Sequence, residues 1–371
     1  MKIAKVIITE PSIPYSKNGS WTQRIEYFLK SDSNVVDYCI CGETEQTIES
    51  KTIFFKVKKI TSRILLKFFP EKRYQNHIAQ IKLLSQKYDH LIICVIDNLK
   101  LKKAVSDYIQ SNNSKEVTTL MFYSCGFSYF LSAENQKELL KNCDEYIFLS
   151  QSSYLYNKES YDEFTSEVTI LNNPIQKNIF HPISKSDKEI LTAKYDLEGK
   201  TIYLWLSHDR EKKGLNLILN AWRDWCQTRE DVVLLVVGAK RNIKVKNVQF
   251  IGEVDSNFVH EYYKLAQVYL FPTLWKEGFG LSLAQAISSG CFCIAANNGS
   301  VKDFFSKQDG ILIDNPNVVS NWTDAIENAY IHVQSGWENP TAGKQILNYE
   351  EWSKMFAQIF LKWEKRIRND N

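Results

Sequence analysis

Residues 268–286 read VYLFPTLWKEGFGLSLAQA, and this stretch decides the fold class of the chain. Its apolar start, Val268–Phe271, has the length and composition of a buried strand, and a helix is expected over Leu281–Ser289. Between them, Gly278 and Gly280 permit a close approach of the backbone to a ligand. A strand that passes through a glycine-containing loop directly into a helix indicates a βα unit of a parallel sheet.

The same alternation of short apolar runs and longer amphipathic stretches extends along the rest of the chain. In the second half, further strands are expected at Ile202–Leu206, Val232–Val237, Val248–Ile251, Cys291–Ala295 and Ile311–Ile313. In the first half, strands are expected at Ile3–Thr9, Val35–Cys41, Leu91–Ile96, Thr118–Tyr123 and Tyr146–Leu149. Helical spacing is found at Trp21–Leu29, Ile78–Tyr88 and Leu215–Cys226. Strands that alternate with helices indicate an α/β protein with parallel sheets covered on both faces.

The length of 371 residues favours two domains, at roughly 100–200 residues each. The periodicity breaks between Asn172 and Ile183, where two prolines and several polar residues indicate a connector. A long amphipathic helix is expected at Glu350–Arg368. The predicted divisions are residues 1–175, 176–348 and 349–371.

The composition is typical of a soluble globular protein, with 44% hydrophobic and 24% charged residues. A net charge of only +3 argues against a dedicated nucleic-acid binder. No run of about 18 apolar residues is present, and the apolar start Ile3–Ile8 is too short for a signal peptide. We therefore expect a cytoplasmic protein.

Eight cysteines are ordinary usage for a chain of this length. Two pairs, Cys39 with Cys41 and Cys291 with Cys293, have C-x-C spacing inside apolar runs. This context favours buried thiols, with a metal site or a disulfide as the alternatives. The absence of a secretion signal favours a reducing compartment.

The glycine loop carries the first candidate site. A helix that begins at Leu281 presents unpaired N–H groups and a partial positive charge of roughly half an elementary unit at its start. This is a site for a phosphate, flanked by Glu277 before the helix and Gln285 one turn inside it. The alternative is a βα loop in which Glu277 merely caps the helix.

A second loop, Ser207–Gly214, reads SHDREKKG and follows the expected strand Ile202–Leu206. Its cations, Arg210, Lys212 and Lys213, would stabilise the negative charge of a diphosphate leaving group. The alternative is a solvated charged loop, and the histidine in it is open to both interpretations.

The order and spacing of the two loops resemble glycosyltransferase family 4, the retaining GT-B enzymes. The resemblance rests on residues 277–286 with Gly290, residues 298–303 (NGSVKD), the Lys212–Leu215 segment, the connector at 173–182, and Gly19 after the first strand. It covers nearly the whole chain, strongly from Asn172 to Asp314 and diffusely in the first block.

The resemblance implies a GT-B fold, with two Rossmann-like domains facing across a cleft and the C-terminal helix returning to the first. The first domain would bind the acceptor and the second a UDP- or GDP-sugar. The implied reaction is retaining hexosyl transfer to a glycan or lipid-linked acceptor in cell-surface polysaccharide synthesis, without a cofactor or a metal. The implied location is cytoplasmic, peripheral at the inner face of the membrane.

Site roles also follow from the resemblance. Glu277 would contact the sugar at the reacting face, and Lys213 would neutralise the diphosphate. Donor contacts are implied for Gly19, Ser207, Arg210, Lys213, Gly252, Glu253, Val254, Gly278, Phe279, Gly280, Leu281 and Gln285. Cys125 would lie on the acceptor side.

Three positions depart from the family pattern. Gln285 stands where the family has a second glutamate, Cys125 where many members have histidine, and Ser300 where a Gly-Gly pair is common. Loss of one charge-assisted hydrogen bond at Gln285 would weaken nucleotide binding by roughly 1–2 kcal/mol. An inactive, nucleotide-sugar-binding partner subunit therefore stays an alternative. An NAD-dependent dehydrogenase is a weaker one, because Thr9–Gly19 lacks the G-x-G-x-x-G motif.

A basic stretch in the first block, residues 54–74, reads FFKVKKITSRILLKFFPEKRY. Seven cations at positions 56–73 surround apolar residues, and Ile60, Ile64 and Phe68 would share one face of a helix over Ile60–Phe69. Such a helix can lie in an anionic membrane interface. A core helix with a solvated face is the alternative, and nucleic acid is a weaker third.

Overall fold

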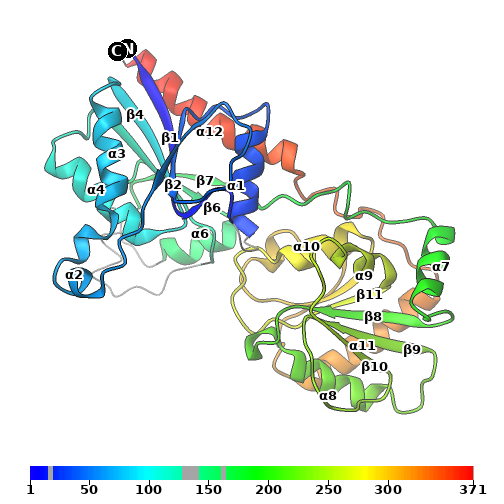
Figure 1. Ribbon diagram of the computed structural model, residues 1–371. Coiled ribbons are helices and arrows are strands. Elements are labelled where there is room, and N and C mark those ends of the chain that lie inside the picture. The colour runs from blue at the N-terminus through cyan, green and yellow to red at the C-terminus, as the bar shows by residue number, and fades with distance from the viewer. Residues whose placement is uncertain (16–19, 128–141, 160–163, 371) are drawn as a thin grey trace. The chain divides into compact units, whose positions relative to one another are not determined.

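Two units make up the chain, and each is built around one parallel sheet (Figure 1). The computed structural model describes residues 1–15, 20–127, 142–159 and 164–370. Unit 1 comprises Met1–Pro174 and Tyr349–Asn371, and unit 2 comprises Ile175–Asn348. The expected boundary between residues 175 and 176 lies one residue from this division.

The sheet of unit 1 has the order β3-β2-β1-β4-β5-β6-β7. Its strands are β1 Ile3–Ser12, β2 Tyr38–Gly42, β3 Ile53–Val57, β4 His90–Ile96, β5 Thr118–Tyr123, β6 Glu145–Phe148 and β7 Glu167–Ile170. All adjacent pairs are parallel. The strand order reverses between β1 and β4, which is where doubly wound sheets bind ligands at their carboxyl edge.

Helices cover both faces of this sheet. They are α1 Ser20–Lys30, α2 Arg63–Phe68, the short 3-10 helix η1 Pro70–Tyr74, α3 Gln75–Ser85, α4 Leu99–Ser111, α6 Gln151–Lys158 and α12 Tyr349–Asn369. Apolar side chains of α3 and α4, among them Ile81 and Val105, form one core with alternate residues of β1, β4 and β5. α1 and α12 pack together, with Phe28 of α1 edge-on against Phe356 of α12.

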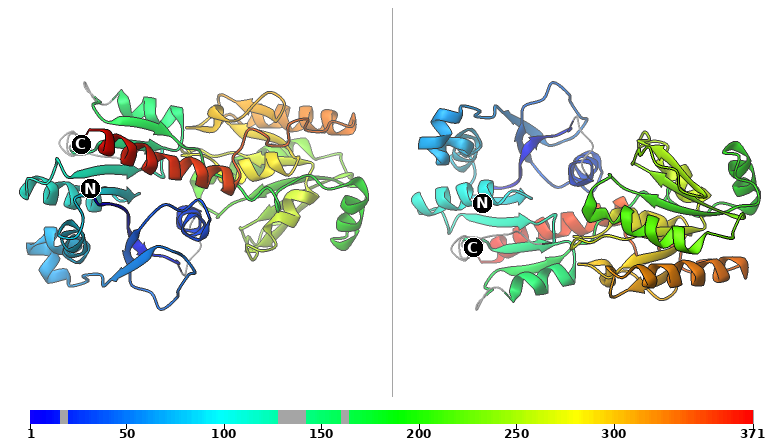
Figure 2. Two further views of the ribbon diagram at one scale, coloured as in Figure 1. Left: turned by 90° about the horizontal axis from the view of Figure 1, so that it is seen from above. Right: turned by 90° about the horizontal axis from the view of Figure 1, so that it is seen from below.

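The terminal helix belongs to unit 1, as predicted. Trp352 is fully buried and stacks on Phe356, which also contacts Tyr123 of β5. Near the other end of α12, Glu364 accepts from Lys5 Nζ of β1 at 2.9 Å. Both views in Figure 2 show this helix alongside the strands of unit 1. Burial of large apolar side chains, at about 1.5–3 kcal/mol each, holds it there.

Unit 2 has a six-stranded parallel sheet of order β10-β9-β8-β11-β12-β13. Its strands are β8 Thr201–Leu206, β9 Val232–Val237, β10 Val248–Gly252, β11 Val268–Phe271, β12 Phe292–Ala296 and β13 Gly310–Ile313. Its helices are α7 Lys185–Lys194, α8 Leu215–Trp225, α9 Val259–Leu265, α10 Leu281–Ser288 and α11 Val319–Gln334, with 3-10 turns η2 Glu211–Lys213 and η3 Val301–Asp303. α8 and α11 share one core that includes Trp222 and Trp322.

Two strands and one helix differ from expectation. Neither β3 nor β7 was expected, since the basic stretch carried only a predicted helix over Ile60–Phe69, which begins after β3 ends. Both lie at the edges of their sheet, where short strands with few buried residues carry a weak period-2 signal. The helix expected over residues 60–69 is only Arg63–Phe68, because Ser62 caps its start and Pro70 prevents its continuation.

The core-helix interpretation of this basic stretch is wrong. No residue of α2 is buried, and Ile64 and Phe68 are 77% and 69% exposed.

All eight cysteines are free, so the buried-thiol interpretation of the C-x-C pairs is confirmed over a disulfide. Among the described residues, no helix combines the length and apolar character needed to cross a bilayer.

Candidate active site in the second unit

Four of the five helices of unit 2 begin without a side-chain cap, and two of these four, α8 and α10, begin directly after a glycine. α8 starts after Gly214 (φ +69°) and α10 after Gly280 (φ +90°), both in the left-handed conformation that glycine adopts readily. Neither N-cap residue offers an oxygen to the N–H groups of the first helical turn. These groups, with the positive end of the helix dipole, are available to an anionic ligand.

The loops that precede these helices contact each other. β8 and β11 are neighbours in the sheet, so their carboxyl ends, and the loops that follow them, meet at one edge. Leu274 N donates to Lys212 O at 2.8 Å. A Cβ on Gly214 would lie 2.1 Å from Pro272 O, so only glycine permits this approach.

An ion pair joins the two loops. Lys213 Nζ lies 2.5 Å from Glu277 Oε1, and both side chains are mostly buried, at 25% and 17% exposure. Thr273 Oγ1 donates to the same carboxylate oxygen at 2.9 Å. The two residues that the sequence assigns to the diphosphate and to the sugar are therefore in direct contact.

A third loop holds the backbone of Glu277. Ser300 N donates to Glu277 O at 3.0 Å, and Asn298 Nδ2 donates to Thr273 O at 2.7 Å. Gly299 has φ +71°, and a Cβ there would lie 2.5 Å from the backbone N and O of Glu277. Ser300 itself is fully buried, and it makes this contact through its backbone N–H. The backbone of the loop is therefore held at Thr273 and at Glu277, which fixes the point from which the Glu277 side chain extends.

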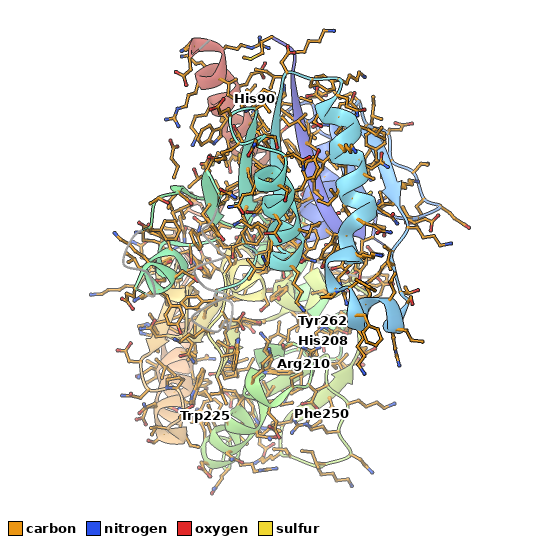
Figure 3. The ribbon with its side chains drawn as sticks, turned by 90° about the vertical axis from the view of Figure 1, so that its left-hand side faces the viewer. His90, His208, Arg210, Trp225, Phe250 and Tyr262 are labelled. Atoms are coloured by element: carbon orange, nitrogen blue, oxygen red, sulfur yellow. The ribbon has the colours of Figure 1, made fainter. Side chains whose placement is uncertain are left out.

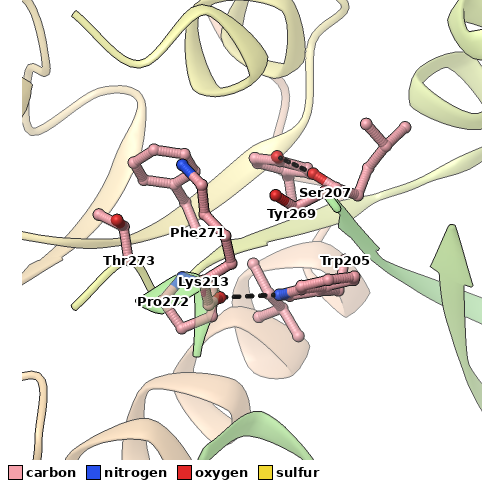
Figure 4. A pocket seen from close by; sticks show the side chains of 9 residues that line it. Trp205, Ser207, Lys213, Tyr269, Phe271, Pro272 and Thr273 are labelled. Atoms are coloured by element: carbon pink, nitrogen blue, oxygen red, sulfur yellow. Dashed lines mark hydrogen bonds between the residues drawn. The ribbon is translucent and has the colours of Figure 1, made fainter. Parts of the chain in front are cut away.

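A small pocket lies beside the pair. It is lined by Trp205, Leu206, Ser207, Lys213, Tyr269, Leu270, Phe271, Pro272 and Thr273 (Figure 4). Trp205 Nε1 donates to Lys213 O at 3.2 Å, which holds the backbone of Lys213 against β8. Of the predicted donor contacts, Ser207 and Lys213 thus line one pocket.

Arg210 lies in the same loop but is exposed, and its backbone bonds with those of His208 and Lys213. Figure 3 shows His208 and Arg210 before α8, with Trp225 at the far end of that helix. The guanidinium of Arg210 is therefore accessible to a ligand that binds at this edge from solvent.

The other predicted donor contacts fall into three places. Gly278, Phe279, Gly280 and Leu281 form the start of α10, where the ring of Phe279 is buried and stacks on Phe304. Only the backbone of Phe279 can therefore face a ligand.

Gln285 contacts a buried tyrosine. Tyr263 O–H donates to Gln285 Oε1 at 3.3 Å, and burial raises the pKa of Tyr263 well above its ordinary value. The tyrosine therefore remains a proton donor. With Oε1 engaged in this bond, the Nε2 amide of Gln285 is left to donate to a ligand.

Gly252, Glu253 and Val254 follow β10. Gly252 has φ +80° and its carbonyl accepts from Gly238 N at 2.7 Å. A Cβ on Gly238 would lie 2.2 Å from Ser207 O. Gly238 therefore contacts both Gly252 and Ser207, which holds the two segments at the same edge of the sheet. The side chain of Glu253 is exposed.

Two predicted residues lie in unit 1. Cys125 N donates to Asp97 Oδ1 at 2.9 Å, and its Sγ lies 3.3 Å from Nη2 of the buried Arg24. Burial raises the pKa of the Cys125 thiol, so it stays neutral. Gly19 lies outside the described residues.

Thr273 and Asn298 had no predicted role, although both lie in the quoted motifs. The signal that could have identified Thr273 is its position just after β11, four residues before Glu277.

Within the described ranges, no group of three or more His, Cys, Asp or Glu side chains is arranged to hold a metal ion.

Comparisons with known proteins are consistent with this geometry. Residues 187–331 match the family model of glycosyl transferases group 1, so the predicted resemblance is confirmed. Phosphatidyl-myo-inositol mannosyltransferase of Mycobacterium leprae is 24% identical over 189 residues, which are 46% of this chain and 48% of that protein. The 2-deoxystreptamine N-acetyl-D-glucosaminyltransferase of Niallia circulans is 28% identical over 35% of this chain and 36% of its own length.

These matches thus span about half the length of the first relative and about a third of the second. Among solved structures, Anabaena HepE in complex with UDP superposes with a TM-score of 0.74 at 13% identity, covering 96% of this chain and all of HepE. At this identity the likeness concerns the fold, and the predicted GT-B fold of two Rossmann-like domains is confirmed.

Proposed function

Since residues 187–331 match the glycosyl transferases group 1 family, we propose that this chain transfers a sugar from a nucleotide-sugar donor to a glycan or lipid-linked acceptor. The observation that carries the proposal is the Lys213–Glu277 pair, enclosed by three glycine-containing loops at the carboxyl edge of a parallel sheet. Two uncapped helix starts face this edge, as a diphosphate would require.

The residues have distinct roles in the proposed reaction. Lys213 and Arg210 neutralise the diphosphate, together with the backbone N–H groups at the start of α10. Glu277 accepts hydrogen bonds from the sugar hydroxyls, and Gln285 contacts the ribose. The segment after β10 lines the base.

The chemical step is retaining transfer. The bond between the anomeric carbon and the diphosphate breaks, and its electron pair leaves with the diphosphate. The acceptor oxygen bonds to the anomeric carbon from the same face, and its proton passes to the departing phosphate. Neither a cofactor nor a metal takes part in this proposal.

The names of the relatives suggest classes of donor and acceptor for the proposed reaction. The name of the first relative specifies mannosyl transfer with phosphatidyl-myo-inositol, the name of the second specifies N-acetylglucosaminyl transfer with 2-deoxystreptamine, and HepE was solved with UDP. We take a UDP- or GDP-hexose as donor, and a lipid-linked glycan of cell-surface polysaccharide synthesis as acceptor. The proposed location is the cytoplasmic face of the membrane.

The test begins with a panel of UDP- and GDP-sugars in a thermal unfolding assay. A true donor at 100 times its Kd stabilises the protein by about 2.7 kcal/mol. That donor is then offered with lipid-linked acceptors, with and without EDTA, and the anomer formed is read by NMR. We expect a retained anomer and turnover that persists in EDTA. Donor binding without turnover on any acceptor would favour an inactive partner subunit, and stabilisation by NAD alone would favour the dehydrogenase.

The exposed tip of unit 1 supports a membrane contact. This tip comprises the apolar residues Ile64, Phe68 and Phe69, of which Phe69 is 47% exposed, and the exposed cations Arg63 and Lys67. An exposed group of large apolar side chains favours binding to another apolar surface. The neighbouring cations Arg63 and Lys67 favour a negatively charged partner over a neutral one. We propose that it lies in the interface of an anionic bilayer.

Not every cation of the basic stretch is available for this contact. Lys56 donates to the carbonyls of Thr44 and Gln46, and Lys59 lies 3.0 Å from Glu10 Oε1. Glu10 is near the carboxyl end of β1, so Lys59 anchors the base of the tip to the sheet edge. The membrane contact therefore depends on Arg63 and Lys67 more than on Lys56 and Lys59.

We expect R63E/K67E and F68S/F69S each to weaken binding to phosphatidylglycerol vesicles by about tenfold or more in cosedimentation, because each basic residue contributes about 1 kcal/mol and the rings add apolar burial. Ile190→Ser is the apolar control, since Ile190 is 70% exposed on α7, where Asp187 and Glu189 accompany the lysines. Vesicle binding that both variants retain at the wild-type level would contradict the proposal.

A further inference from the structure

The hydroxyl of Thr273 lies against the carboxylate of Glu277. Thr273 is 1% exposed, and its Oγ1 donates to Glu277 Oε1 at 2.9 Å. The alternative acceptor for this proton, Trp275 O, lies farther away at 3.3 Å and is uncharged. The shorter bond to a charged acceptor is the stronger of the two.

Lys213 contacts the same carboxylate oxygen. Under the proposed function, Lys213 turns to the diphosphate of the donor when the donor binds. Glu277 then loses its cation at the moment when it must hold the sugar. A carboxylate with no remaining partner would rotate, and its alignment with the sugar hydroxyls would be lost.

We infer that Thr273 is the positioning residue that keeps the Glu277 carboxylate aimed at the donor sugar once Lys213 has moved to the diphosphate. This inference rests on the proposed function. The hydroxyl holds Oε1, and Oε2 is then presented to the sugar.

The backbone around Thr273 is fixed independently of its hydroxyl. Asn298 Nδ2 donates to Thr273 O, and Leu274 N donates to Lys212 O. Ser300 N likewise holds Glu277 O. Replacing the hydroxyl by a methyl group of the same size removes its bond to Glu277 and the long bond that it accepts from Trp275 N at 3.5 Å, while these backbone contacts still hold the loop.

The test compares Thr273→Val with Thr273→Ser. We expect T273V to lower kcat by about 10- to 100-fold and to raise the KM for the donor by about tenfold, and T273S to stay within a few-fold of the wild type in both quantities. A merely structural role would instead lower the thermal stability and the protein yield of T273V, and would leave kcat and KM of the folded protein near the wild-type values.

A binding measurement does not depend on turnover. The gain in affinity of the nucleoside diphosphate sugar over the nucleoside diphosphate reports the sugar contacts of Glu277. We expect this gain to shrink by about tenfold in T273V and to be kept in T273S. Equal gains in the wild type and T273V would overturn the inference while leaving the proposed function intact. A wild-type protein that binds no nucleoside diphosphate sugar would overturn the proposed function, and this role with it.

Discussion

We expect Glu277→Gln to lower kcat of the proposed transfer by about 100-fold or more, while the affinity for the nucleoside diphosphate changes little. The amide keeps the size of the side chain but loses its negative charge. In the proposed reaction, this charge strengthens the hydrogen bonds that Glu277 accepts from the sugar hydroxyls, and it stabilises the positive charge that develops at the anomeric carbon. Glu277→Ala should have the same effect on turnover. Steady-state kinetics and calorimetric titration with the nucleoside diphosphate measure the two quantities separately.

Glu211→Gln is the matched control for this substitution. Glu211 is an exposed carboxylate in the loop before α8, two residues from Lys213, and it makes no ion pair in the described part of the chain. Its replacement should leave kcat unchanged. If E277Q turns over at the wild-type rate, Glu277 does not contact the reacting sugar, and the role assigned to it is wrong.

We expect Lys213→Ala to weaken binding of the nucleoside diphosphate by about 10- to 100-fold and to leave binding of the free nucleoside almost unchanged. The ammonium group makes a charge-assisted contact with the phosphates, worth about 1.5–3 kcal/mol. The nucleoside has no phosphate and does not use this contact. Titration calorimetry with both ligands gives the two affinities.

Lys212→Ala is the control for Lys213→Ala. Lys212 was expected among the cations beside the diphosphate, but its side chain is exposed, and its Nζ lies over the ring of Trp275 at 5.2 Å, whereas Lys213 pairs with Glu277. We expect K212A to bind both ligands nearly as the wild type does. Equal losses of nucleoside and nucleoside diphosphate affinity in K213A would exclude a specific phosphate contact at this residue.

The α/β class and most strands were predictable because they depend on local patterns. The run Val268–Phe271 was predicted residue for residue, and the helix after Gly280 begins at Leu281 as expected. Both follow from short-range rules, namely apolar runs of strand length and the conformational freedom of glycine. The edge strands β3 and β7 were missed because few of their residues are buried, and burial produces the pattern.

The exposure of α2 could not be predicted from its sequence. The spacing of Ile64 and Phe68 is the same for a helix in a core and for one that presents its apolar face to a membrane. Only the packing of the surrounding elements distinguishes them, and in the described residues nothing buries either side chain.

By itself, the sequence determined the α/β class, most of the strands, the two glycine loops and the residue types in them. Only the tertiary structure decided that Lys213 meets Glu277, 64 residues later, and that Tyr263 occupies Oε1 of Gln285. The first contact arises because β8 and β11, which are separated in sequence by β9 and β10, are neighbours in the sheet. Local periodicity specifies each strand but not its neighbours, because strand pairing is decided by long-range packing of the whole sheet.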